Sequence, residues 1–559
     1  MELERSTFSD GEAQTHGKRG GWITFPFIVA SASLLTIGSA GWWSNLIVYL
    51  IEKFEVKSIE AAQVSNIFSG CATMFPVVGA IFADSFFGCF SIVWISSLVS
   101  LLGTTLLTLT ATITSLRPLP CETRSESNTC PGPSTLDFII LYTGIALASV
   151  GMAGTRFTLT TIGANQFPNA EERATFFNWY FFSSYASNIL ASTAIVYVED
   201  NVSWGWGFIL CTAANGLGLA IFLCGSRVYR LVEPQGSPFT GLARVVVASI
   251  RKRKVTLSEE SEDYYHGQAS VQKTGAEAPT KSFRFLNCAA LITEGEISED
   301  GSIAKPWRLC TVEQVEDLKA LIRIFPIWST SLFLATPICV QASLLVLQAL
   351  TMDRHLGPHF KIPAGSMLVF GSACICIGLV LLDRVIKPTW QKLTGRTLTP
   401  LQLIGVGHVL IILGMAVTAL VELKRRSVAR SHHLLEQTGA VVPMSVLWLV
   451  PQLALVGLGE SIQFPSQVEL YYRDFPNSLK TMSMAVGAVL VGISFYLGTA
   501  VIGCIKRATG WLPNNINKGK LDNVFWLMAA IGTLNLGYFL VCAKLYKYRN
   551  RENGDNSSA

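Results

Sequence analysis

Charged residues are scarce in this sequence: they make up 14% of its 559 residues, whereas hydrophobic residues make up 50%. About a quarter of an average soluble domain is charged. The net charge of +5 does not favour a nucleic-acid partner. The seven histidines and thirteen cysteines follow no zinc-site spacing, and no catalytic constellation is apparent. We therefore expect a membrane protein that is not an enzyme and that holds no metal or cofactor.

Twelve long hydrophobic runs explain the shortage of charge. A helix needs about twenty apolar residues to cross the hydrocarbon core of a bilayer. The runs are residues 22–51, 60–83, 85–115, 138–170, 174–198, 201–226, 325–352, 362–382, 397–421, 437–468, 481–505 and 522–543. A long polar segment separates the first six from the last six. The sequence thus predicts an all-α membrane protein with twelve transmembrane helices in two six-helix bundles.

The polar segment between the bundles is predicted to be a long cytoplasmic linker with an amphipathic helix, and not a third core. The expected divisions are an N-terminus at 1–21, a first bundle at 22–227, the linker at 228–318, a second bundle at 319–545 and a tail at 546–559. The basic cluster Arg251–Lys254 is more simply a contact for anionic lipid than for nucleic acid. Kinase regulation of the linker or the termini is kept as a hypothesis.

Orientation follows from the lysines and arginines of short loops, which stay in the cytoplasm. The linker, the loop 383–396 and the basic tail fall on one side of the membrane if twelve spans are correct. We therefore expect both termini in the cytoplasm of a multi-pass protein. The basic loop 422–430 falls outside on this count. Cys121 and Cys130 share the outer loop 116–135, where a disulfide between them could persist.

Two hydrophobic runs carry a full charge near the middle: Arg156 in the fourth and Glu460 in the tenth. A charge at the bilayer centre costs about 2.5–3.5 kcal/mol on insertion scales, so such residues face protein or water and usually mark a solute path. Our interpretation is that Arg156 and Glu460 face each other across a solute path. The alternative is that they merely neutralise each other.

Other polar residues within the runs have less specific interpretations. Asn45 lies in a first run that lacks any ionisable residue, and it could line a cavity or bond a neighbouring helix. Gln341 could bind a solute or bridge helices. Pro337 is either a tolerated helix kink or a gating hinge. His408, alone in the ninth run, is expected to be a packing residue.

Several motifs in chain order resemble a known family. Gly79, Asp84 and Gly88 match the loop between spans two and three of the major facilitator superfamily, in its proton-coupled oligopeptide transporter form. The segments 163–167 and 176–182, 307–319, and Pro451-Gln452 with Gly459-Glu460, resemble plant nitrate and peptide transporters. The resemblance covers nearly the whole chain and implies the same fold. In that loop, the Asp caps a helix and helps to lock the halves together.

The resemblance can be carried over residue by residue. The family's span-four lysine aligns with Arg156, and its span-ten acidic residue aligns with Glu460. The glutamates and arginine that couple transport to protons on span one align with Ala32, Leu35 and Thr36, so all three ionisable groups are missing. Stoichiometric proton coupling is therefore not expected, although Glu460 leaves one titratable group.

The first span, with Phe25-Pro-Phe27, Gly41-Trp42 and Asn45, is similar to the nitrate-excretion subgroup of the plant family. This resemblance implies low-affinity nitrate efflux at the plasma membrane by alternating access. Export of chloride or of a larger plant metabolite, such as a glucosinolate or a hormone, remains an alternative within the same class, as does a channel-like anion pathway. A transport-dead nitrate receptor that signals through residues 228–318 is the alternative from another class.

Overall fold

The computed structural model describes residues 20–546, apart from 83–86, 117–132, 232–237, 259, 261–262, 268–278, 281, 299–301, 359, 438 and 475–479. Asp84, Cys121 and Cys130 fall outside the described residues. The predictions made for them therefore stay predictions.

Six helical rods make up the N-terminal half. Their helices are α2 (Phe25–Ser44), α3 (Leu46–Phe54), α4 (Ser58–Phe82), α5 (Gly88–Thr112), α6 (Thr135–Asn165), α7 (Ala170–Leu190), α8 (Val196–Asn201) and α9 (Trp204–Cys224). Helices α2 and α3 form one rod that is interrupted at Asn45. A π-helical turn at Ala191–Ile195 joins α7 to α8. Ser134 and Asp137 form a capping box that starts α6.

The C-terminal half repeats this arrangement with six rods. Its helices are α11 (Val312–Leu350), α12 (Leu368–Leu381), α13 (Lys387–Thr394), α14 (Pro400–Ser431), α15 (Val450–Asp474), α16 (Lys480–Ala508) and α17 (Leu521–Leu545). A π-helical turn at Leu382–Ile386 joins α12 to α13. Capping boxes begin α11 at Thr311 and α14 at Thr399, each closed by a glutamine three residues later.

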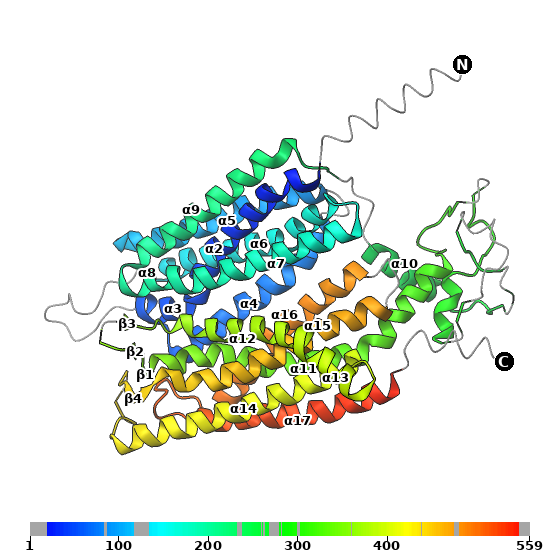
Figure 1. The fold of residues 1–559 in the computed structure, drawn as a ribbon. Helices are drawn as coiled ribbons and strands as arrows, with labels where there is room; N and C mark the ends of the chain where they lie inside the picture. Colours follow the sequence, from blue (N-terminus) through cyan, green and yellow to red (C-terminus); the bar gives the residue numbers. More distant parts are fainter. Residues whose placement is uncertain are drawn as a thin grey trace.

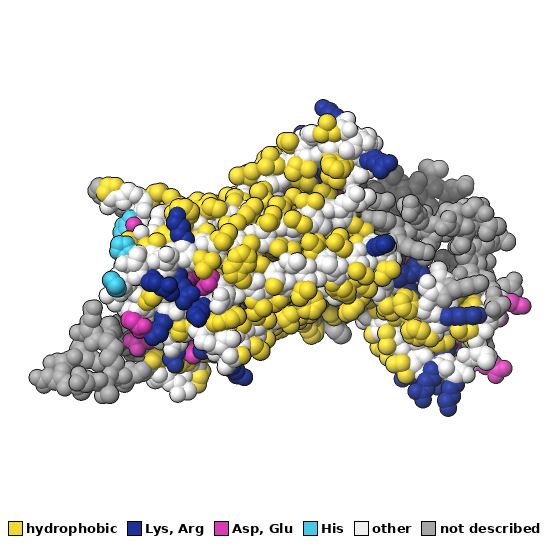
Figure 2. Space-filling model, turned by 90° about the horizontal axis from the view of Figure 1, so that it is seen from below, with side chains coloured by type: hydrophobic (Ala, Val, Ile, Leu, Met, Phe, Trp, Pro, Cys, Tyr) yellow, Lys and Arg dark blue, Asp and Glu magenta, His cyan; other side chains and the backbone are white. Residues whose placement is uncertain are grey.

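The two halves lie side by side with their helices roughly aligned (Figure 1). Within the described residues, eleven helical rods are long and apolar enough to cross a membrane, and α4 is a further rod of 25 residues. Hydrophobic side chains cover the middle of the molecule, whereas charged side chains gather toward its two ends (Figure 2). The prediction of an all-α, multi-pass membrane protein with two bundles is confirmed.

Small residues allow α5 and α6 to pack closely, as is common between membrane helices. A Cβ atom added at Gly103 would collide with the backbone of Ala148, and one added at Gly151 would collide with the backbone of Ser100. The backbones of the two helices are therefore in direct contact. This contact fixes the rotation of α6 about its axis.

The end of the molecule opposite the linker, called here the far end, carries the two small sheets (Figure 1). Strand β1 (Met352–Asp353) pairs in parallel with β4 (Val442–Ser445), and β2 (His355–Leu356) forms a hairpin with β3 (Phe360–Lys361). Helix α2 begins, and α17 ends, at the other end, which we call the linker end. The linker and both terminal helix ends therefore lie on one side.

The linker contains a core of its own, so the expectation of a linker without a core is wrong. Its amphipathic helix α10 (Pro238–Arg251) buries Val245 and Ala248 against a 3₁₀ helix at Arg284–Ala289 and against the first turns of α11. The same environment raises the pKa of the Cys310 thiol to about 11, because burial disfavours the thiolate. A buried ion pair joins Lys252 to Glu296 at 2.5 Å.

Two predicted loops are helical in the structure. Residues 383–396 are largely occupied by the π-helical turn and α13, and 422–430 form the last part of α14. In the second case, Glu422 and Arg425 stand one turn apart and pair with each other, which lets the helix continue beyond the apolar run. The outer basic loop that complicated the orientation count is therefore not a loop.

Candidate functional site

Arg156 lies two residues after a tight contact between α6 and its neighbours. Gly154 faces Ser96 of α5, where a Cβ atom would collide with the serine side chain, and a Cβ atom at Gly79 would lie 3.5 Å from the Cα atom of Gly154. The glycine face of α6 is thus packed against α4 and α5. Arg156 is exposed. Among the described residues, no hydrogen bond or ion pair of its guanidinium group is formed.

Glu460 lies on α15 in the other half and is half-buried. No ion pair joins Glu460 to Arg156, although both belong to the described part of the chain. Tyr185 on α7 lies within electrostatic reach of both charges. Cys339 on α11 also lies within reach of Glu460. The cation and the carboxylate therefore approach the same region from opposite halves without neutralising each other through direct contact.

Asn45 lies in the break between α2 and α3 and is almost completely buried. Its Nδ2 atom donates a hydrogen bond of 3.2 Å to Oε2 of Glu199, whose side chain is 1% exposed. The other carboxylate oxygen of Glu199 has no partner among the described residues. The structure therefore places Asn45 in a helix-bridging contact near the far end, and Glu199 is a buried carboxyl group that the sequence analysis missed.

Gln341 and Pro337 both lie on the buried side of α11. Nε2 of Gln341 donates to Oγ1 of Thr418 on α14 at 2.9 Å, which is the bridging role considered from the sequence. Helix α11 continues through Pro337. His408 is fully buried and stacks on Phe539 at 4.7 Å between ring centroids, as expected for a packing residue.

The three span-one positions that align with the family's proton-coupling motif carry either an apolar side chain or a hydroxyl group that is hydrogen-bonded within its own helix. Ala32 and Leu35 are buried in a hydrophobic cluster with Phe222 of α9. Oγ1 of Thr36 donates to the carbonyl oxygen of Ala32 at 2.7 Å. None of these three groups titrates in the physiological range.

Gly79 and Gly88 flank the undescribed residues 83–86. Gly79 permits the approach of α4 to Gly154 on α6, as noted above. Gly88 has φ of +71° at the start of α5, a conformation that favours glycine. Helix packing at Gly79 and the backbone conformation at Gly88 therefore explain why glycine occupies these positions, independently of any role for Asp84.

Contacts between the two halves concentrate from the middle of the bundle to the far end. Oγ of Ser366 donates to the carbonyl oxygen of Ser192 at 2.7 Å, and Arg354 pairs with Asp200 at 3.3 Å. Lys506 pairs with Glu60 on α4 at 3.1 Å. Among the described residues, no hydrogen bond or ion pair joins the two halves near the linker end. Within the described residues, the two halves are therefore joined from mid-depth to the far end.

Two contacting bundles of membrane-spanning helices, with an ionisable side chain within a span of each half, are typical of a membrane transporter. The model of the POT family (PTR2) matches residues 90–518. Relatives in Arabidopsis thaliana match along the whole chain. The protein belongs to the POT family, in its plant NRT1/PTR branch, and it is a transporter and not an enzyme.

Two of these relatives illustrate the match. Protein NRT1/PTR FAMILY 2.7 is 50% identical, with 100% of this chain and 98% of the relative covered, and Protein NRT1/PTR FAMILY 2.3 is 51% identical, with 98% and 97% covered. Among solved structures, an auto-inhibited POT family peptide transporter superposes with a TM-score of 0.67 at 17% identity, covering 94% of this chain and 97% of its own. At this identity the structural likeness supports the fold alone.

Proposed function

We propose that this transporter mediates low-affinity efflux of nitrate, or of a similar small anion, and that it is not stoichiometrically coupled to protons. Arg156 is the residue on which the proposal rests. It is an exposed cation at mid-depth in a membrane helix, and its guanidinium group has no hydrogen-bond or ion-pair partner among the described residues. A guanidinium group presents a planar fork of donors, which suits a planar oxyanion.

The lack of coupling groups supports export down a gradient. Ala32 and Leu35 pack into an apolar cluster, and Thr36 bonds to its own helix. The free energy of a monovalent anion falls by about 2.3 kcal/mol per 100 mV when it leaves a compartment with negative potential. An uncoupled carrier with a cationic site would therefore export nitrate across a plasma membrane with an inside-negative potential.

The arrangement of the two halves suggests how the site is reached. The far end is held together by contacts such as Arg354–Asp200, whereas Arg156 and Glu460 are not paired. In the proposed cycle, nitrate enters from the linker end and binds Arg156. Glu460 then takes over as partner of Arg156 after the anion leaves on the far side. This cycle places the linker and both termini in the cytoplasm.

The test is nitrate flux from loaded proteoliposomes, with membrane voltage and pH gradient imposed separately. Arg156→Ala should lower the flux at least about tenfold, because hydrogen bonds to charged groups contribute about 1.5–3 kcal/mol. Arg156→Lys should give an intermediate rate, since it keeps the charge and loses the fork. Arg384→Ala, which removes an exposed arginine from the π-helical turn after α12, serves as the matched control.

The same vesicles separate the remaining alternatives. Wild-type flux from Arg156→Ala would contradict the proposed site, and uphill nitrate uptake driven by external acidification alone would contradict the absence of coupling. Chloride or a glucosinolate as the preferred tracer would identify a different solute for the same path. Nitrate binding without any tracer flux would favour a receptor.

A further inference from the structure

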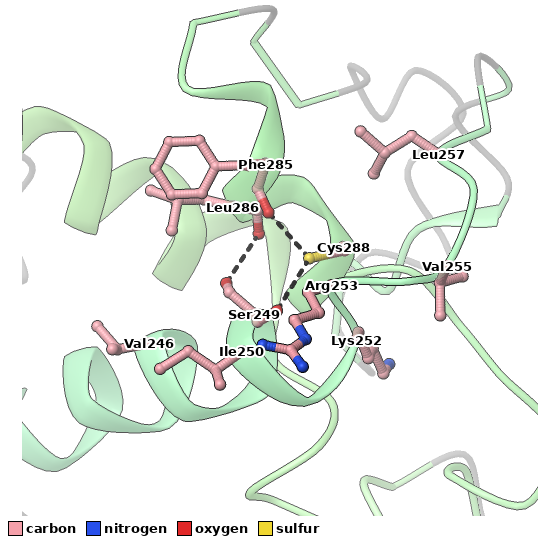
Figure 3. A pocket seen from close by; sticks show the side chains of 10 residues that line it. All are labelled: Val246, Ser249, Ile250, Lys252, Arg253, Val255, Leu257, Phe285, Leu286 and Cys288. Carbon is pink, nitrogen blue, oxygen red and sulfur yellow. Dashed lines mark hydrogen bonds between the residues drawn. The ribbon is translucent and has the colours of Figure 1, made fainter.

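A pocket lies in the linker, outside the membrane bundle. It is formed by α10, by the turn that follows α10 and by the 3₁₀ helix at Arg284–Ala289, and it encloses about 550 Å³ (Figure 3). Its walls are mostly apolar, with Val246, Ile250, Val255, Leu257 and Phe285 among them. This is the size of a pocket that takes a small ligand or a lipid chain.

Large apolar side chains remain exposed at this pocket. Ile250 is 61% exposed and Phe285 is 65% exposed, and both line the cavity. They belong to different segments, so the exposed surface is not the edge of a single helix. Clustered apolar exposure beside a pocket is typical of a surface that contacts lipid or another apolar partner.

Cations stand beside the same pocket. Arg251, Arg253 and Lys254 are exposed, and Arg253 lines the cavity. Lys252 is different, because its ammonium group is buried and neutralised by Glu296 at 2.5 Å. Among the described residues that line the pocket, none is acidic. Burial raises the pKa of the lining Cys288 thiol, so this group is neutral at physiological pH.

The linker is held close to the membrane bundle. Leu242 on α10 packs against the cluster that contains Ile324 and Leu321 on α11. Helix α11 is a candidate membrane span, and the linker follows directly after another candidate span, Trp204–Arg227. Lysine and arginine side chains gather beside hydrophobic ones at this end of the molecule (Figure 2). The pocket therefore lies at the linker end of the membrane-spanning helices, on the side that faces the head groups of one leaflet.

We propose that the linker pocket binds one anionic phospholipid of the adjacent leaflet, with an acyl chain along Ile250 and Phe285 and the phosphate group at Arg253 and Lys254. The combination of apolar walls and a cationic rim carries this inference. An inorganic anion would use the cations and leave the apolar walls exposed, whereas a neutral apolar ligand would not need the cations. The lipid would hold the linker against the membrane, a role separate from the proposed anion transport.

The experiment uses the full-length protein in nanodiscs, with peptide-resolved hydrogen exchange of residues 238–257 as the readout. Nanodiscs of phosphatidylglycerol and phosphatidylcholine are compared with nanodiscs of phosphatidylcholine alone. Amides of α10 should exchange at least several-fold more slowly in the anionic discs. Inorganic phosphate added to the phosphatidylcholine discs should give no protection.

Variants assign the effect to the pocket. The double variant Arg253→Ala/Lys254→Ala should lose the difference between the two lipid compositions, and Ile250→Ser should reduce it. Lys305→Ala/Arg308→Ala removes the same number of exposed linker charges outside the lining and should retain the difference. Equal exchange in both lipids for the unaltered protein, protection by phosphate alone, or an equal loss in both double variants would each overturn the proposal.

Discussion

The buried ion pair between Glu422 and Arg425 on α14 gives the sharpest test of the fold. Arg425 is fully buried and donates to both oxygens of Glu422, at 2.9 and 2.7 Å. It also donates to Thr351 at 3.0 Å and to Asn517 at 2.7 Å. Nε2 of Gln348 on α11 donates to Glu422 at 2.7 Å. The pair thus joins α14 to α11 and to the loop that precedes α17.

Removing one partner should be at least as damaging as removing both. Arg425→Leu leaves the carboxylate of Glu422 buried without its cation, a change that costs about 3–5 kcal/mol. Glu422→Leu/Arg425→Leu removes both charges and leaves only neutral groups such as Gln348 and Asn517 short of a bond, at about 1–3 kcal/mol each when they stay buried. We therefore expect the double variant to be no less stable than Arg425→Leu alone.

The assay is thermal unfolding in detergent micelles of the unaltered protein, both single variants and the double variant. The apparent Tm should fall most for Arg425→Leu, and the second substitution should not lower it further. The exposed pair Lys518–Glu436, at 3.0 Å, is the control, because a surface pair contributes about 0–1 kcal/mol. Additive effects of the two substitutions, or a loss for Arg425→Leu as small as that of the surface pair, would refute this reasoning.

Two further predictions concern packing and the closed far end. Gly151→Ala should markedly lower the yield of folded protein and its apparent Tm, because the added Cβ meets the backbone of Ser100. Gly216→Ala, whose Cβ would lie 3.6 Å from its nearest neighbour, should leave both unchanged; equal effects would contradict the packing. Asp200→Ala should remove the ion pair with Arg354 and raise the fraction of molecules open at the far end. Distances between spin labels on the two halves would measure this fraction, and an unchanged distribution would count against the gating role.

The sequence could predict the number and type of the membrane rods, because each rod is marked by a local feature. Long apolar runs set the spans. Capping residues such as Thr311 and Thr399 mark where helices begin. The sequence also indicates Arg156 as a candidate site residue, since a lone charge in an apolar run stands out against its own neighbours.

Features that depend on distant partners could not be predicted in the same way. Glu422 and Arg425 follow an apolar run, and a count of charges therefore assigns them to a loop. Only their mutual pairing and the partners on other elements keep them inside a helix. The core of the linker could not be predicted for the same reason, because Val245, Leu286 and Val315 are far apart in sequence and no periodic pattern connects them.

Asn45 and Gln341 illustrate a limit in the interpretation of single polar residues. Each was considered as a solute contact and as a helix bridge, and the local sequence is compatible with both. In the structure, each amide donates to one buried side chain, that of Glu199 or of Thr418. Which interpretation holds is decided by a residue more than 70 positions away.

The placement of the charges follows the division between rigid and moving parts. Glu422 and Arg425 belong to one half and are fully buried, so their pairing does not depend on contacts between the halves. Arg354 and Asp200 join different halves, but each side chain is 10% exposed and the pair lies at the far end, where water can replace the partner when that end opens.

Arg156 and Glu460 differ from both of these pairs, because they belong to different halves and lie at mid-depth. A permanent ion pair between them would lose several kcal/mol of attraction each time the halves separated, because a charge deprived of its partner in a low-dielectric region is costly. In the proposed cycle, an anion bound to Arg156 would replace that attraction at the stage when Glu460 has moved away. The unpaired arrangement is therefore the one that the proposed cycle requires.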